Sequence, residues 1–160
     1  MVSSVTPSSW PASRSSPLAE VRLFTVAEAE AALPLVRRIL ADLAVEYPLW
    51  RSAVSDYELL AAASRGDWGE TPEQLAAREQ VTVRAERING WMEELEQIGC
   101  VLKGFEPPLV DFYSLSQDRL IFLCWQPEDI HITHWHEVDA GFAGRQPLAP
   151  ESIRHAGRET

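Results

Sequence analysis

The sequence predicts an α+β protein, in which a long antiparallel helical hairpin is followed by a small antiparallel β-meander. Two observations support this fold class. Apolar residues recur in steps of three and four over most of residues 26–99, which is the spacing of helices that pack side by side. After Gly99 the apolar period shortens to two and turn-forming residues become frequent, which is typical of short antiparallel strands.

The chain is expected to form one domain between two tails. Residues 1–20 are dense in Ser and Pro and lack the apolar core of a secretory signal, so they predict a disordered tail. Residues 21–148 form the predicted α+β domain, with the hairpin over residues 26–99 and the sheet over residues 100–148. Residues 149–160 are polar, and we expect a second frayed tail there.

The first helix is expected to begin at Val26, because Thr25 and Glu28 have the spacing of a capping box. Pro34 predicts a kink or a break between a short helix over residues 26–33 and a longer one, since proline donates no amide hydrogen and clashes with the preceding turn. The longer helix has a coiled-coil seam that calls for a partner helix. The seam consists of Val36, Leu40, Leu43, Tyr47, Trp50, Val54, Tyr57 and Ala61.

The second helix has the clearest start signal of the chain. Thr71-Pro72-Glu73-Gln74 combines an N-cap, a proline at the first helical position and a capping-box glutamine, and Gly99 is the expected stop. The short connection over residues 64–70 and the similar helix lengths predict an antiparallel hairpin. The seam of this helix includes Val81, Ala85, Ile88, Met92 and Leu95.

The remaining domain predicts three or four strands. Pro107-Pro108 separates the first two, and Ser116-Gln117-Asp118 is a hairpin turn before the most apolar strand. Residues 139–144 contain two glycines and predict a loop. The expected strands are residues 100–105, 109–114, 119–125 and 130–135.

Composition limits the classes of partner. A formal net charge of −10 opposes binding to phosphate backbones, so we expect no nucleic-acid partner, and no apolar run reaches the length of a membrane span. Cys100 and Cys124 lack CxxC spacing, which favours free thiols in the reducing cytoplasm. The aromatic seams offer more apolar surface than a small sheet can cover, so we expect a homodimer in which two hairpins form a four-helix bundle.

Chemistry-bearing residues are concentrated in residues 130–148, which include three of the four histidines. In an extended strand His134 and His136 share a face and His131 does not. His134, His136 and Asp139 therefore form a candidate metal set for Zn²⁺ or Fe²⁺, which Asp111 or Cys124 from neighbouring strands could complete. On this hypothesis the protein is a metal-dependent enzyme acting on a small molecule, with His136 and Glu137 as catalytic groups and Glu137 as the proton acceptor.

Two other interpretations of the same stretch remain open. In the structural one, His136 and Glu137 tie the sheet to the helices, Trp135 packs in the core, and Arg145 pairs with Asp111 or Asp139. In the binding one, Arg145 and neighbouring glycine amides capture a small anionic ligand, with Trp125 or Trp135 stacked on it. The sequence favours a non-enzymatic ligand-binding or scaffold module with a site in residues 135–145, lined by Asp111, Trp135 and Arg145.

A family resemblance covers residues 23–148. Its most specific part is Trp135-His-Glu-Val-Asp139-Ala-Gly-Phe-Ala-Gly144-Arg145-Gln-Pro147, with further matches at Phe24-Thr25-Val-Ala-Glu28-Ala29, Leu33-Pro34, Leu109-Val-Asp111-Phe112 and Leu123-Cys-Trp125. On these residues the chain resembles the family named domain of unknown function 2203. The resemblance implies a helical hairpin followed by a small sheet, and it implies no activity.

The chain departs from that family pattern at two places. His134 stands where members usually have an aromatic residue, and Gln126-Pro127-Glu128 stands where they usually have a Gly-Glu-Pro turn. A site that requires His134 would therefore be particular to this protein.

Overall fold

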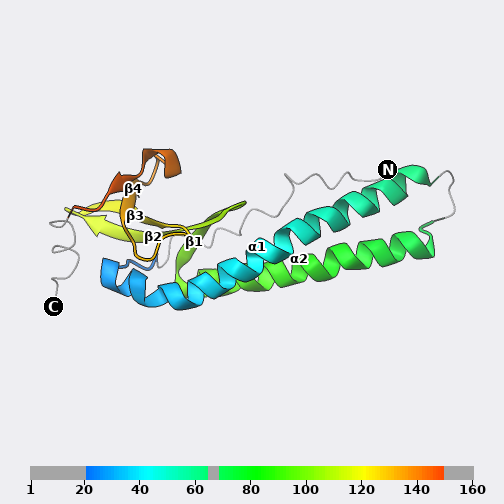
Figure 1. Cartoon of the computed structure of the whole chain (residues 1–160), viewed down its shortest axis with the longest axis horizontal. Helices are drawn as coiled ribbons and strands as arrows, with labels where there is room; N and C mark the ends of the chain where they lie inside the picture. The colour runs from blue at the N-terminus through cyan, green and yellow to red at the C-terminus, as the bar shows by residue number, and fades with distance from the viewer. Residues whose placement is uncertain (1–20, 65–68, 150–160) are drawn as a thin grey trace.

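The computed structural model describes residues 21–64 and 69–149. Figure 1 shows that this part of the chain folds as a helical hairpin followed by a single antiparallel sheet, which confirms the predicted α+β class. The predictions for the tails over residues 1–20 and 150–160, and for the centre of the interhelical turn, fall outside the described residues.

The hairpin consists of α1 (Val26–Ala63) and α2 (Pro72–Ile98). Both helices begin with a complete capping box, formed by Thr25 with Glu28 and by Thr71 with Gln74. Each box satisfies backbone amides that have no partner inside the helix. The second helix ends at Gly99, whose left-handed backbone (φ 101°) favours glycine, so the predicted start and stop are both confirmed.

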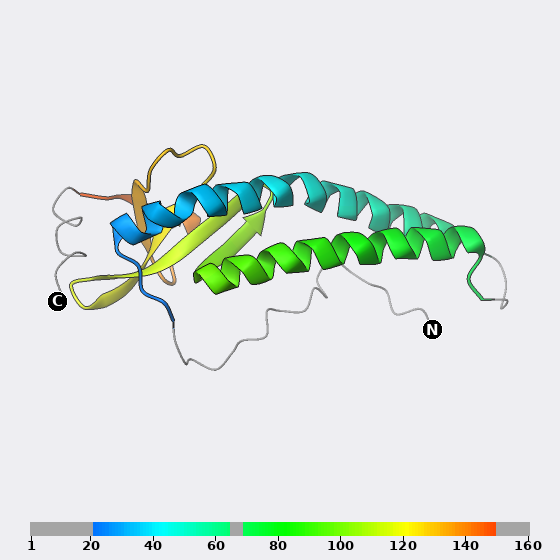
Figure 2. The same ribbon diagram turned by 90° about the horizontal axis from the view of Figure 1, so that it is seen from below.

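The division into two helices at Pro34 is wrong, because α1 is continuous through Pro34 and Pro48, so of the predicted kink or break no break is found. Pro34 cannot donate the hydrogen bond that the carbonyl of Glu30 would accept in a regular helix, which is tolerated here at a residue that is only half-buried. Leu33 and Val36 are buried on either side of Pro34 and hold this turn against the core. Figure 2 shows that the long helix is curved rather than broken.

The sheet has five strands in the order in which they occur in the chain. The predicted hairpin turn is confirmed at Gln117 and Asp118, which have positive φ angles of 50° and 61°, as a tight two-residue turn requires. The strands are β1 (Cys100–Phe105), β2 (Pro108–Ser116), β3 (Arg119–Trp125), β4 (His134–Glu137) and β5 (Gln146–Pro147). The short β5 was not predicted.

The fourth strand begins at His134 and not at Ile130, because α1 binds the preceding segment. The Ile132 amide donates to the Glu30 carboxylate (3.2 Å), and the Ile132 side chain is buried. The Arg37 guanidinium donates to the carbonyls of Pro127 (2.8 Å) and Asp129 (3.0 Å). This connection is therefore held against the helix, and β4 pairs with β3 only from His134 onward.

The main core lies between the hairpin and one face of the sheet. Val110, Phe112, Leu123 and Trp125 from β2 and β3 are almost fully buried against helix residues such as Leu40. Both views show that the far half of the hairpin projects beyond the sheet (Figures 1 and 2). The predicted seam of α1 is therefore buried in its first half and only half-buried further along.

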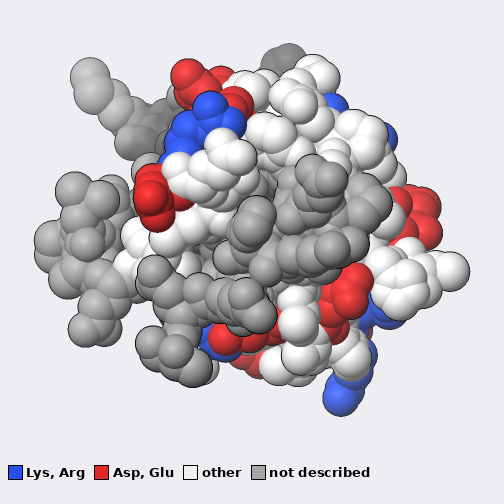
Figure 3. Space-filling view, turned by 90° about the vertical axis from the view of Figure 1, so that its left-hand side faces the viewer, with Lys and Arg blue, Asp and Glu red and all other residues white. Residues whose placement is uncertain are grey.

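The surface of the described residues has mixed charge. Figure 3, which looks at the sheet end of the molecule, shows acidic and basic side chains in small separate groups. Within the described part of the chain, no helix combines the length and the hydropathy needed to cross a bilayer.

Candidate functional site

A polar cluster occupies the face of the sheet that points away from the helices. Side chains alternate between the two faces of a strand, and Val110, Phe112, Leu123 and Trp125 face the core. Asp111 in β2 and Cys124 in β3, which are direct cross-strand partners, therefore lie on the opposite face. His136 in β4 is the partner of Phe122 and comes from the same face.

The three side chains meet closely. One oxygen of Asp111, the sulfur of Cys124 and one ring nitrogen of His136 all lie within 4.8 Å of one another. The His136 Nε2 is 2.8 Å from Asp111 Oδ2, and each of the three residues is at most 3% exposed. The cluster is thus a buried set of one oxygen, one sulfur and one nitrogen, contributed by three neighbouring strands.

The protonation of His136 follows from its partners. Its Nδ1 lies 2.7 Å from the Glu137 carbonyl oxygen, which can only accept a hydrogen bond, so Nδ1 has the hydrogen and donates. In the neutral ring, Nε2 would then present a lone pair to the carboxylate of Asp111. Two lone pairs at hydrogen-bond distance repel each other, so a proton must lie between these two atoms.

Burial also determines the charge of the other two groups. Desolvation raises the pKa of the Asp111 carboxyl above its usual value, although the His136 ring opposes this rise. Desolvation and the neighbouring Asp111 raise the pKa of the Cys124 thiol to about 12. The positive charge of Arg145 lowers the pKa of Cys124, and the positive charge of Lys103 lowers the pKa of Asp111, but both effects are smaller than that of burial. Near neutral pH the Cys124 sulfur is therefore protonated.

The other predicted residues of β4 have different surroundings. Glu137 forms an ion pair with Arg119 of β3 (2.8 Å), and Trp135 packs partly buried against the main core. His136 and Glu137 therefore form their contacts within the sheet. The structural interpretation had expected them to connect the sheet to the helices, and these contacts do not. The expected packing of Trp135 against the core is found.

His134 and Asp139 do not join the buried cluster. His134 is half-buried and its Nδ1 lies 2.8 Å from the Thr133 hydroxyl, while Asp139 is exposed in the turn after β4. Among the described residues, the one group of three such ligands that lie within 4.8 Å of one another is Asp111, Cys124 and His136. Of the predicted metal set, only His136 belongs to it.

Arg145 lies at the end of the short 3₁₀ turn η2 (Phe142–Gly144), with its guanidinium 4.2 Å from the Phe142 ring centroid. Within the described part of the chain it forms no ion pair with Asp111 or Asp139, so the expected clamp is not formed. The positive charge of Arg145 lowers the pKa of the Cys124 thiol, although burial and Asp111 raise it more.

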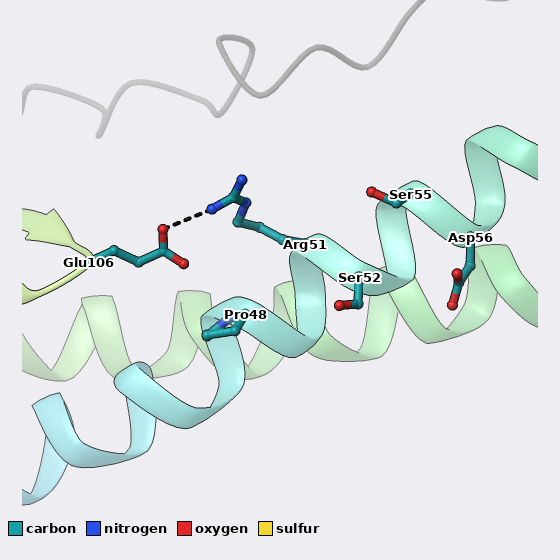
Figure 4. A pocket seen from close by; sticks show the side chains of 6 residues that line it. All are labelled: Pro48, Arg51, Ser52, Ser55, Asp56 and Glu106. Atoms are coloured by element: carbon teal, nitrogen blue, oxygen red, sulfur yellow. Dashed lines mark hydrogen bonds and ion pairs between the residues drawn. The ribbon is translucent and has the colours of Figure 1, made fainter.

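A hollow of about 390 Å³ lies elsewhere, on α1 beside the turn between β1 and β2 (Figure 4). Arg51 of the helix and Glu106 of the turn form a 2.8 Å ion pair across its edge. The hollow is lined by Pro48, Arg51, Ser52, Ser55, Asp56 and Glu106. None of the predicted site residues lines it.

The fold and the cluster together define a class of small α+β proteins, with a projecting helical hairpin and a meander sheet that buries an Asp–Cys–His cluster on its outer face. The family model described as "Uncharacterized conserved protein (DUF2203)" matches residues 22–148. The chain therefore belongs to this family, as its motifs indicated. No curated protein and no solved structure gave a match.

Proposed function

We propose that the protein is a non-enzymatic scaffold module that acts in the cytoplasm as a homodimer, joined through the far half of its helical hairpin. The observation that supports this most directly is the burial pattern of the helices. The last buried residue of α1 is Ala53, and in α2 no residue between Gln74 and Ile88 is buried. Two helices packed only on each other leave this half of the hairpin poorly covered.

The exposed side of α1 has the pattern of a second, weaker seam. Its members follow one another in steps of four and three. Large apolar side chains stand at its ends, and two polar residues stand in its middle, which would fix the register of a partner helix. The members are Val45, Leu49, Ser52, Asp56 and Leu59.

The ends of this second seam are solvent-exposed in the single chain. Leu59 is 70% exposed and Val45 66% exposed. Near the middle, a groove of about 230 Å³ lies between the helices and is lined by Leu49, Ser52, Ala53, Asp56, Ala77, Gln80 and Arg84. Small side chains permit close approach of another helix, so a second copy of the hairpin is the partner that this surface fits.

The two predicted catalytic groups support a non-enzymatic role. Both ring nitrogens of His136 are engaged, and its side chain is 2% exposed. Glu137 is paired with Arg119. A general acid or base must reach the proton that it transfers, and neither group is free to do so. The metal-dependent enzyme, with His134, His136 and Asp139 as ligands, is therefore the weaker hypothesis.

A small anionic ligand remains the second candidate function, because Arg145 is half-buried and its guanidinium forms no ion pair with a carboxylate of the described residues. Loss of Arg145 would then abolish ligand binding without changing the oligomeric state. This outcome separates the ligand-binding hypothesis from the scaffold hypothesis.

Self-association can be tested by sedimentation equilibrium of the untagged full-length protein. The disrupting variant is the double substitution Leu49→Glu with Leu59→Glu. A two-fold dimer contains each substitution twice, which gives four altered sites. At a loss of about 1 kcal/mol of binding free energy for each site, the dissociation constant of the dimer should rise about 1,000-fold. The matched control is Ile130→Glu, because Ile130 is 78% exposed but lies in the connection before β4.

The proposal predicts a wild-type dimer at micromolar concentration, a monomeric double variant with unchanged helix content, and a dimeric control. A wild-type protein that stays monomeric under these conditions would refute it. So would a double variant that remains as dimeric as the control.

A further inference from the structure

We propose that the buried cluster of Asp111, Cys124 and His136 is a binding site for one zinc-class divalent metal ion. The inference is independent of self-association, because the cluster lies on the outer face of the sheet, away from the hairpin. It rests on the identity of the three donor atoms, on their approach within 4.8 Å, and on the second hydrogen bond of His136.

The donor set selects the metal. Imidazole and thiolate are preferred by Zn²⁺ and its neighbours in the first transition row, whereas Mg²⁺ and Ca²⁺ require oxygen ligands. One carboxylate, one imidazole and one thiolate supply three of the four positions of a tetrahedral ion, and a water can supply the fourth.

The geometry needs only a small adjustment. Zinc lies about 2.0–2.3 Å from oxygen, nitrogen and sulfur ligands, which separates the ligand atoms of a tetrahedral site by roughly 3.3–3.6 Å. The 2.8 Å contact between His136 and Asp111 must open by about 0.5 Å. The sulfur of Cys124 lies within 4.8 Å of the other two ligand atoms, so it must approach them by no more than roughly 1.5 Å.

The surroundings of His136 match those of a histidine ligand. A metal-bound imidazole usually donates its other ring nitrogen to a carbonyl or a carboxylate, which fixes its orientation. Here the Glu137 carbonyl accepts from Nδ1 at 2.7 Å and directs Nε2 at the cluster. The Phe122 ring, with its centroid 5.3 Å from that of His136, further restricts the imidazole.

Charge balance in this buried space also suits a dication. Without metal, one proton lies between His136 and Asp111 and one remains on the Cys124 sulfur, which leaves the cluster with no net charge. Binding of one Zn²⁺ displaces both protons, giving a carboxylate, a thiolate and a neutral imidazole around the ion, again with no net charge. The exchange therefore creates no uncompensated charge in a low-dielectric interior.

The test uses the untagged full-length protein, stripped of metal with a chelator and titrated with Zn²⁺ and, separately, with Co²⁺. The proposal predicts one bound ion per chain and release of two protons for each Zn²⁺. It also predicts a thiolate-to-cobalt charge-transfer band with the visible bands of tetrahedral Co²⁺. The key variant is Cys124→Ser, which should lose the charge-transfer band.

Two controls separate binding at this cluster from binding elsewhere on the chain. Cys100→Ser alters the other buried thiol, which lies on the helix face, and should keep the cobalt spectrum. His134→Phe alters the adjacent histidine outside the cluster and should keep one ion per chain. Loss of Cys124 should reduce zinc affinity by more than the roughly 10–100-fold typical of an outer-shell partner.

Absence of stoichiometric binding to the folded wild-type chain would overturn the proposal. A charge-transfer band that persists in Cys124→Ser, or disappears in Cys100→Ser, would also overturn it. If Cys124→Ser does not fold, Asp111→Asn with an intact circular dichroism spectrum provides the same comparison through the bound stoichiometry and the proton release.

Discussion

The pair formed by Asp111 and His136 should be strongly coupled energetically in the metal-free protein. We consider His136→Phe, Asp111→Leu and the double variant, each of which replaces a polar side chain by an apolar one of similar size. The two groups are 2.8 Å apart and 2% exposed, so each single variant leaves the remaining partner buried and without its main hydrogen bond.

The expected magnitudes follow from this burial. Breaking a buried ion pair by removing one partner typically costs about 3–5 kcal/mol. The cost should be lower here, about 2–3 kcal/mol for His136→Phe, because Asp111 can escape its charge by taking up a proton, as its raised pKa allows. Replacing both partners by apolar groups is often nearly neutral, so the double variant should lose less stability than the two single variants together.

The assay is urea unfolding followed by far-ultraviolet circular dichroism, with a chelator present and at one fixed protein concentration, so that neither metal nor dimerisation changes the comparison. The double-mutant cycle should give a coupling free energy of about 2–4 kcal/mol. A double variant whose loss equals the sum of the single losses would show that the two groups do not stabilise each other, and the argument from burial would fail.

Three further predictions concern the thiols, a helix cap and the connection before β4. Burial raises the pKa of both Cys100 and Cys124 to about 12, so at pH 8 about one thiol in ten thousand is ionised. Alkylation of the two thiols, measured with a chelator present, should therefore be slow until urea unfolds the chain. Rapid labelling of the native protein would contradict this. Thr71→Ala removes a capping box and should lower the free energy of unfolding by about 1 kcal/mol in the same urea assay, and an unchanged midpoint would contradict it. Arg37→Ala removes two hydrogen bonds to carbonyls of the connection before β4 and should lower the free energy of unfolding by about 1–2 kcal/mol. Amide hydrogen exchange over residues 126–133 should become faster. Unchanged exchange there would show that Arg37 does not hold this segment.

The parts of the fold that could be predicted are those fixed by short-range chemistry. The start of α2 at Pro72 and its stop at Gly99 depend on caps within a few residues, and both predictions were right. The continuity of α1 through Pro34 depends instead on tertiary packing around Leu33. The late start of β4 similarly depends on Glu30, about a hundred residues away in the sequence, and no local pattern contains that information.

In the candidate site, too, some features follow from the local sequence and others depend on contacts between distant parts of the chain. The tight turn at residues 117–118 fixes the register of β2 and β3, so the pairing of Asp111 with Cys124 could have been derived from the predicted hairpin. The position of His136 could not, because the connection into β4 is long and irregular. The sequence consequently grouped His136 with His134 and Asp139, its neighbours in the chain, and for metal binding indicated Asp111 and Cys124 only as residues that could complete that set.

The contacts between the first helix and the late part of the chain also constrain how the protein is made. The Ser114 hydroxyl donates to the Phe24 carbonyl across 90 residues, and the Ile132 amide binds Glu30 across 102 residues. During synthesis, Phe24 and the first turns of α1 therefore lack these native contacts until nearly the whole domain has left the ribosome. Such non-local contacts slow folding, and they make every nascent chain that ends before β4 an incomplete core with exposed apolar surface.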